Sequence, residues 1–270
     1  MPLPIIAASD RKALAGLFAG GWDAPESVRS LVAAILGDVR ERGDDAVVEL
    51  TRRFDAPECT LETMRVEIPS LANAHKLVPL EIARGLALAH ERVAAYHARQ
   101  LPTEIQHRDD DGTVSAFLSR PLAAIGAYVP SGSAPLPSSV IMTTVPAKIA
   151  GVERIVVATP PRRDGTINPA TLFACSLCGV DELFGIGGAQ AIAALAYGTQ
   201  QIAPVDKIVG PGNVWVTEAK RQVFGTCGID GLAGPSEVLV VADAHSRADF
   251  VAAELLAQAE HDPLARVAAV

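Results

Sequence analysis

The chain has 270 residues, of which 49% are hydrophobic and 4% aromatic, and its 31 acidic and 23 basic residues give a formal net charge of −8. This length allows two domains, and a composition dominated by Ala, Val, Leu and Ile is typical of α/β proteins whose parallel strands are buried on both faces. The acidic balance argues against a nucleic-acid-binding protein, no apolar run reaches the roughly 18 residues of a membrane span, and the N-terminus lacks a secretory signal, so we expect a cytoplasmic protein without nucleic-acid or membrane partners.

The four cysteines do not suggest a disulfide framework. Cys175 and Cys178 have C-x-x-C spacing, but they lie in an apolar helical stretch that ends at Gly179. A redox pair normally sits at an exposed helix N-terminus, so we expect these two thiols to be inert packing residues. Cys59 and Cys227 are isolated, and a nucleophilic role for either is open but has no support in the sequence.

The first 120 residues are predicted to be mainly helical. Apolar positions recur at helical spacing over 27–51, with a break at the Arg-Gly-Asp-Asp turn of 42–45, and again over 80–96. A charged turn is expected at 107–112.

Strands and helices alternate from residue 123 onward, which predicts a doubly wound, mainly parallel sheet. The strands are expected at 123–129, 154–158, 182–185, 207–210, 238–242 and from 266 to 270. The helices are expected at 140–150, 169–178, 189–197, 214–224 and 246–261.

Glycine-rich or polar turns follow several of these strands. They cover 185–190, 210–213, 234–237 and 258–261. In open α/β sheets, ligands bind at the carboxyl ends of strands, where backbone amides at helix N-termini face anions. The turns therefore predict a nucleotide-type crevice.

Three residues near the first two turns are candidate ligand contacts, each with a plainer alternative. Gln190 lies in the first turn of a helix, where its amide could reach a nucleotide, although the neighbouring glycines do not spell the dinucleotide fingerprint G-x-G-x-x-G. Asn213 occupies an N-cap position, and capping alone explains it. Tyr128 ends a strand before a Pro/Ser/Gly loop, where tyrosines are usually half-buried packing residues.

Gln258 and His261 lie three residues apart on one helix face, with Glu254 beside them. Two ligands at this spacing can share a metal, but a catalytic zinc ion usually needs three protein ligands, and glutamine is an uncommon one. The spacing alone therefore favours a polar helix end. Asp243 and His245 are expected to form the turn before that helix.

Each motif is weak by itself, but the order of these and other motifs along the chain is specific to one protein family. They include Tyr128-Val-Pro130, the Gly-Gly-Ala-Gln segment of 187–198, the Val-Asp-Lys-Ile-Val-Gly-Pro-Gly-Asn segment of 205–213, and the segments 146–151, 158–161, 216–223, 233–239 and 256–261. With them the chain closely resembles the histidinol dehydrogenases from about residue 27 onward.

The resemblance implies a zinc-dependent, NAD-linked enzyme of histidine biosynthesis, which oxidises L-histidinol to L-histidine through L-histidinaldehyde in two hydride transfers. Carried over by position, Tyr128, Gln190 and Asn213 match NAD contacts. Ser236 matches a substrate contact, and Gln258 and His261 match two zinc ligands that also border the substrate. A homodimer is implied as well.

The resemblance further implies two Rossmann-like lobes preceded by N-terminal helices. We expect N-terminal helices and the start of the first lobe at 1–127, the NAD-side lobe at 128–235, and a return to the first lobe at 236–270. Family members are longer than this chain, and their additional part carries two more zinc ligands and a Glu-His pair for acid/base chemistry. Glu260 and His261 of this chain are not that pair, because their Gln-Ala-Glu-His context matches the metal-binding segment. We therefore expect the N-terminal portion of a longer chain, with one lobe truncated, no catalytic pair of its own and no activity alone. The alternative is a non-catalytic module that binds NAD or another ligand.

Overall fold

A computed structural model of the chain describes residues 5–7, 9–18, 24–131, 135–232, 237–261 and 265–270. The chain divides into two compact units, Glu26–Ala233 and the combination of Met1–Pro25 with Gly234–Val270.

The larger unit begins with the helix pair expected from the sequence. Helix α2 (Glu26–Arg42) and helix α3 (Asp44–Phe54) are separated by Gly43, whose φ of 60° only glycine adopts readily. Helix α2 buries one stripe at helical spacing, made of Val28, Val32, Leu36 and Val39. This stripe faces the rest of the unit, since α2 contacts α9 and α10.

Short elements follow: α4 (Leu61–Met64), β1 (Arg65–Val66), α5 (Leu71–Ala74) and the 3-10 turn η1 (His75–Leu77). Helix α6 (Leu80–His97) confirms the second predicted helix, and the 3-10 turn η2 (Ala98–Gln100) ends it.

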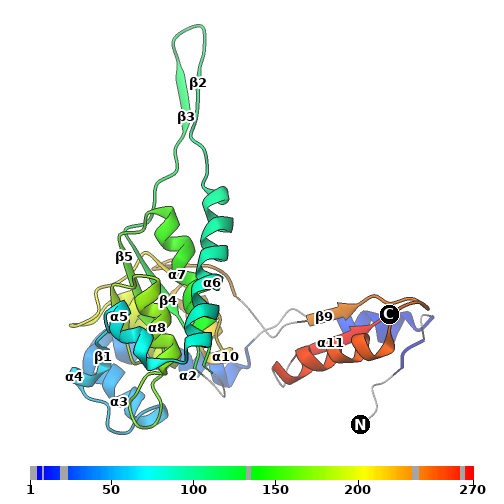
Figure 1. Cartoon of the computed structure of the whole chain (residues 1–270), viewed down its shortest axis with the longest axis horizontal. Coiled ribbons are helices and arrows are strands. Elements are labelled where there is room, and N and C mark those ends of the chain that lie inside the picture. The colour runs from blue at the N-terminus through cyan, green and yellow to red at the C-terminus, as the bar shows by residue number, and fades with distance from the viewer. Residues whose placement is uncertain (1–4, 8, 19–23, 132–134, 233–236, 262–264) are drawn as a thin grey trace. The chain divides into compact units, whose positions relative to one another are not determined.

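The predicted charged turn proves to be the tip of an antiparallel hairpin. Strands β2 (Ile105–Arg108) and β3 (Val114–Phe117) pair from Ile105 with Phe117 to Arg108 with Val114. The hairpin projects away from the sheet and helices of this unit (Figure 1), and all of its strand residues are exposed. The sequence shows the turn but not the strands, because a ribbon exposed on both faces has no hydrophobic alternation.

A six-stranded sheet forms the centre of the larger unit. Its order is β1-β6-β5-β4-β7-β8, and every pairing is parallel except that of β1 with β6. The remaining strands are β4 (Ala124–Tyr128), β5 (Arg154–Ala158), β6 (Glu182–Phe184), β7 (Lys207–Val209) and β8 (Gly228–Ile229). The predicted α/β fold with a mainly parallel sheet is confirmed.

Two groups of helices accompany this sheet. Helices α7 (Pro137–Ala150) and α8 (Pro169–Leu177) contact each other and α6, whereas α9 (Gly188–Tyr197) and α10 (Val214–Val223) contact each other and α2. All residues of β4 and four of the five in β5 are buried. Burial on both faces explains why these strands are almost continuously apolar.

The division expected at residues 127 and 235 stays a prediction. Strand β4 crosses the first of these boundaries, and α2 and α3 belong to the same compact unit as α9 and α10.

The smaller unit contains helix α1 (Arg11–Phe18), strand β9 (Glu237–Val240), helix α11 (Ala248–His261) and strand β10 (Arg266–Ala269). Strands β9 and β10 form a parallel pair, and α11, which lies between them in the chain, contacts both. The strand and helix predicted at 238–242 and 246–261, and the strand predicted at 266–270, are therefore present. None of the helices in the described part of the chain combines the length and apolar character needed to cross a membrane.

Candidate functional site

The candidate site lies where four parallel strands end together. Because β6, β5, β4 and β7 run in the same direction, their carboxyl ends lie at one edge of the sheet. Tyr128 is the last residue of β4, the turn of residues 185–187 follows β6, and the turn of residues 210–213 follows β7. The sheet thus brings both predicted turns and Tyr128 to a single edge, the position at which α/β proteins bind nucleotides.

Tyr128 joins the first turn through its side chain. The residue is 3% exposed, and its hydroxyl accepts a hydrogen bond of 3.2 Å from the backbone N–H of Gly188. Gly188 has a φ of 62°, which favours glycine at the start of α9. Burial raises the pKa of Tyr128 to about 12, and the nearby Asp55 carboxylate adds to this rise. The tyrosine therefore stays protonated at neutral pH.

The same tyrosine contacts the second turn through its backbone. A Cβ atom on Gly210 would lie 2.1 Å from the carbonyl oxygen of Tyr128, and Gly210 has a φ of 113°. Only glycine can occupy this position without moving one of the two strands. Tyr128 therefore touches the turns that follow β6 and β7.

A buried lysine and an aspartate form hydrogen bonds with the backbone carbonyl and N–H of Gly210. The Nζ of Lys220 donates to the Gly210 carbonyl oxygen at 3.0 Å and also to Asp230, while the Gly210 N–H donates to Asp230 Oδ2 at 2.8 Å. Lys220 is 3% exposed. Sequence reasoning missed this pair; a lysine on the buried face of an amphipathic helix is the signal that could have revealed it.

Asn213 caps helix α10, as its plainer interpretation predicts. Its Oδ1 accepts from the backbone N–H groups of Trp215 at 3.1 Å and Val216 at 3.2 Å. This cap uses only the acceptor side of the amide, and the residue remains at the edge formed by the strand ends.

Gln190 is buried rather than exposed at the helix start. It is 2% exposed, and its Nε2 donates to Asp55 Oδ2 at 3.5 Å. Asp55 follows α3, and burial raises its pKa to about 6. Sequence reasoning missed Asp55, because nothing in the local sequence shows that residue 55 meets residue 190.

The predicted metal and substrate residues belong to the smaller unit. Gln258 is part-buried on α11, and His261 is the last residue of that helix, although its side chain and the whole of Ser236 lie outside the described residues. Within the described ranges, no group of three or more His, Cys, Asp or Glu side chains is placed to hold a metal ion. Two ligands fall short of the three that a catalytic zinc ion takes from protein.

The cysteines provide no nucleophile. All four are free and buried. Burial raises the pKa of Cys175, and it raises the pKa values of Cys178 and Cys227 to about 11. Burial also raises the pKa of Cys59. The prediction that Cys175 and Cys178 are packing residues is confirmed by their burial, and the raised pKa values disfavour thiol chemistry at all four cysteines because little thiolate forms at neutral pH.

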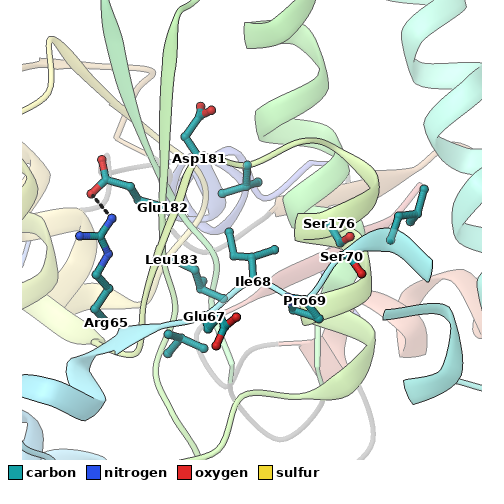
Figure 2. A pocket seen from close by; sticks show the side chains of 12 residues that line it. Arg65, Glu67, Ile68, Pro69, Ser70, Ser176, Asp181, Glu182 and Leu183 are labelled. Carbon is teal, nitrogen blue, oxygen red and sulfur yellow. Dashed lines mark ion pairs between the residues drawn. The ribbon is translucent and has the colours of Figure 1, made fainter. Parts of the chain in front are cut away.

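A cavity of about 500 Å³ lies elsewhere, along the edge where β1 pairs with β6 (Figure 2). It is lined by residues 65–71, Ser176 and residues 180–183, and it includes none of the candidate site residues. Glu182 at its wall is already paired with Arg154 at 2.6 Å and with Arg65 at 3.7 Å. The carboxyl edge of the sheet, where polar groups from several strands converge, is the better candidate site.

Comparison with known proteins agrees with the resemblance. The family model described as histidinol dehydrogenase matches residues 22–270. A histidinol dehydrogenase of Rhodospirillum rubrum is 50% identical over 268 residues, which are 98% of this chain and 62% of that protein. One of Rhizobium meliloti is 52% identical over 237 residues, covering 88% of this chain and 54% of that protein.

The fold is also similar to a solved structure. The crystal structure of histidinol dehydrogenase from Elizabethkingia anophelis matches with a TM-score of 0.86 and 36% identity, covering 96% of this chain and 59% of that one. The chain therefore spans between 54% and 62% of the length of these relatives.

Proposed function

Because the chain belongs to the histidinol dehydrogenase family, we propose that it carries the NAD-binding part of an enzyme of histidine biosynthesis that oxidises L-histidinol to L-histidine through L-histidinaldehyde. The observation that carries the proposal is the convergence of Tyr128 with the turns before α9 and α10 at one sheet edge. Tyr128, Gln190 and Asn213 are the proposed NAD contacts.

The residues at this edge fit a dinucleotide. The N-terminal turns of α9 and α10 start at Gly188 and Val214, and helix N-termini favour the negative charge of a pyrophosphate. The glycines at 188 and 210 adopt positive φ angles of 62° and 113°, which let the backbone turn at this edge. NAD, when bound, accepts hydride from the substrate carbon.

The part played by each side chain follows from its environment. Tyr128 stays neutral and supports the Gly188 turn, Asn213 fixes the start of α10, and Gln190 presents a buried amide at the start of α9. None of the three is a base at neutral pH, so their proposed role is to bind and orient NAD.

Zinc fits the residues of this chain only in part. We propose Gln258 and His261 as two zinc ligands that also border the substrate, and Ser236 as a substrate contact. Because about three protein ligands are needed, these residues do not form a catalytic zinc site by themselves. The chemistry proposed for this chain is therefore cofactor binding.

The proposals for substrate, assembly and location rest on family membership. We propose L-histidinol as the substrate of the complete enzyme, two NAD molecules per histidine formed, a homodimer, and a cytoplasmic location.

Titration of residues 1–270 with NAD by isothermal calorimetry tests the proposal. We expect saturable binding that is weakened by replacing Tyr128 or Gln190. A matched control is Tyr96→Phe, because Tyr96 is 62% exposed on α6. A folded chain that does not bind NAD would contradict the proposed function.

A further inference from the structure

Asp55 is a polar residue at the candidate site whose side chain has no evident structural task. It is the C-cap of α3, but the cap uses its backbone N–H, which donates to the Thr51 carbonyl at 2.9 Å. The carboxylate itself points elsewhere, toward the start of α9.

One hydrogen bond and two further observations place the Asp55 carboxylate among the proposed NAD residues. Its Oδ2 lies 3.5 Å from Gln190 Nε2, and it lies 3.3 Å from the position that a Cβ atom on Gly187 would occupy. Its charge also helps to raise the pKa of Tyr128. Asp55 thus lies within the group of side chains that includes two of the three proposed NAD contacts.

The carboxylate is poorly satisfied where it lies. Among the described residues, its oxygens accept a single side-chain hydrogen bond, the long one from Gln190, although a carboxylate can accept about four. Burial raises its pKa to about 6. When a ligand supplies a strong donor to such a half-buried acceptor, the new hydrogen bond makes the free energy of binding more favourable.

We propose that Asp55 is a further cofactor-binding residue, whose carboxylate accepts a hydrogen bond from an uncharged donor of the dinucleotide. NAD offers two such donors, a ribose hydroxyl and the nicotinamide carboxamide. The proposal rests on the proposed NAD site. It also assigns Gln190 a second task, because its amide links Asp55 to the start of α9.

The charge of Asp55 has a consequence for specificity. Carboxylates bind ribose hydroxyls at many dinucleotide sites, and they repel a phosphate in the same place. If the donor is the adenosine ribose, Asp55 therefore disfavours NADP relative to NAD.

Calorimetry on residues 1–270 with Asp55→Asn tests the inference at pH 7.5, where the carboxylate is ionised. We expect NAD to bind about tenfold more weakly, the loss typical of a hydrogen bond to a charged group. Asp45→Asn is the matched control, because Asp45 is exposed on the same helix and carries the same charge. This control should bind NAD like the unchanged chain.

ADP-ribose distinguishes the two possible donors. If a ribose hydroxyl is the donor, Asp55→Asn weakens ADP-ribose as much as NAD; if the carboxamide is the donor, only NAD is weakened. Failure of the unchanged chain to bind NAD would overturn the proposed function, whereas equal NAD affinity of the unchanged chain and Asp55→Asn would overturn only the role of Asp55.

Thermal unfolding separates this role from a structural one. A ligand-binding Asp55 predicts that Asp55→Asn melts at the same or a higher temperature, because a poorly satisfied, half-buried charge is removed. A lower melting temperature together with unchanged NAD affinity would show a structural residue instead. If the Asn variant does not fold, Asp55→Ser, which also removes the carboxylate, should show the same loss of affinity.

Discussion

Tyr128 and Gly188 lie 60 residues apart in sequence, and the hydroxyl of the first accepts a 3.2 Å hydrogen bond from the backbone N–H of the second. This bond ties the end of a central strand to the start of α9. The Tyr128 backbone meanwhile packs on Gly210, so that one residue holds together the two turns proposed to bind NAD.

Replacing Tyr128 with Phe should therefore affect stability and binding together. The part-buried N–H of Gly188 loses its acceptor, which costs about 0.5–1.5 kcal/mol of unfolding free energy. Urea unfolding should show this loss, and calorimetry should show weaker NAD binding. Tyr96→Phe, at an exposed position of α6, should change neither quantity. Unchanged stability of Tyr128→Phe would mean that the bond to Gly188 is not formed in solution.

Gly210→Ala should be among the most damaging single-methyl additions in the chain. The new Cβ would lie 2.1 Å from the Tyr128 carbonyl oxygen, at a φ of 113° that other residues avoid. We expect a loss of several kcal/mol, or failure to fold. Gly85→Ala is the control: nothing lies within 4 Å of its Cβ position in α6, and it should stabilise the helix by about 0.5–1 kcal/mol. Comparing the melting temperatures of both variants checks the prediction.

Lys220→Met should destabilise the turn of residues 210–213. The change leaves the Gly210 carbonyl and Asp230 without their buried donor, and because Asp230 is 40% exposed we expect a loss of about 2 kcal/mol, less than for a fully buried pair. Lys148→Met breaks an exposed pair with Asp181 and should cost no more than about 1 kcal/mol. Urea unfolding of both variants measures the difference. Equal losses would show that burial of Lys220 does not matter.

Ionisation of Asp55 should make the folded state less stable as the pH rises. Its folded-state pKa of about 6 lies above the usual aspartate value of about 3.9, so the folded state binds the proton more tightly than the unfolded state. The ionised group therefore destabilises the fold above pH 6, and this cost disappears as the pH falls toward 4.

The comparison of Asp55→Asn with the unchanged chain isolates that contribution, because other carboxylates titrate alike in both. The Asn variant should be the more stable one at pH 7, and the difference should shrink as the pH is lowered to about 4. A difference that grows on acidification would mean that the Asp55 pKa is lowered rather than raised.

Zinc binding and turnover should be deficient in residues 1–270. Gln258 and His261 are two ligands where about three are needed, and a base for the carbinol proton contributes about 10²- to 10⁴-fold to such reactions. We expect weak zinc binding in competition with a chelating dye, and no histidinol-dependent NADH formation. The complete Rhodospirillum rubrum relative serves as the positive control. Robust turnover by residues 1–270 would contradict the assigned metal residues.

The sequence by itself determined the elements that depend on local burial. Alternation of apolar runs from Ala124 to Val223 predicted the parallel strands and their helices, and the Asn213 cap followed from its position before an amphipathic segment. The strands of the exposed hairpin at 105–117 were not predicted, because strands with both faces in solvent show no alternation of apolar and polar residues.

Only the tertiary structure decided which of these residues meet. The strand order β1-β6-β5-β4-β7-β8 differs from the chain order, and it sets Tyr128 at a central strand end, within reach of Gly188 and Gly210. The contacts of Asp55 with Gln190 and of Lys220 with Asp230 arise in the same way. Sequence periodicity indicates which face of a helix or strand is buried. The residues that meet at a sheet edge depend instead on how the whole unit packs, so no local sequence pattern could reveal Asp55.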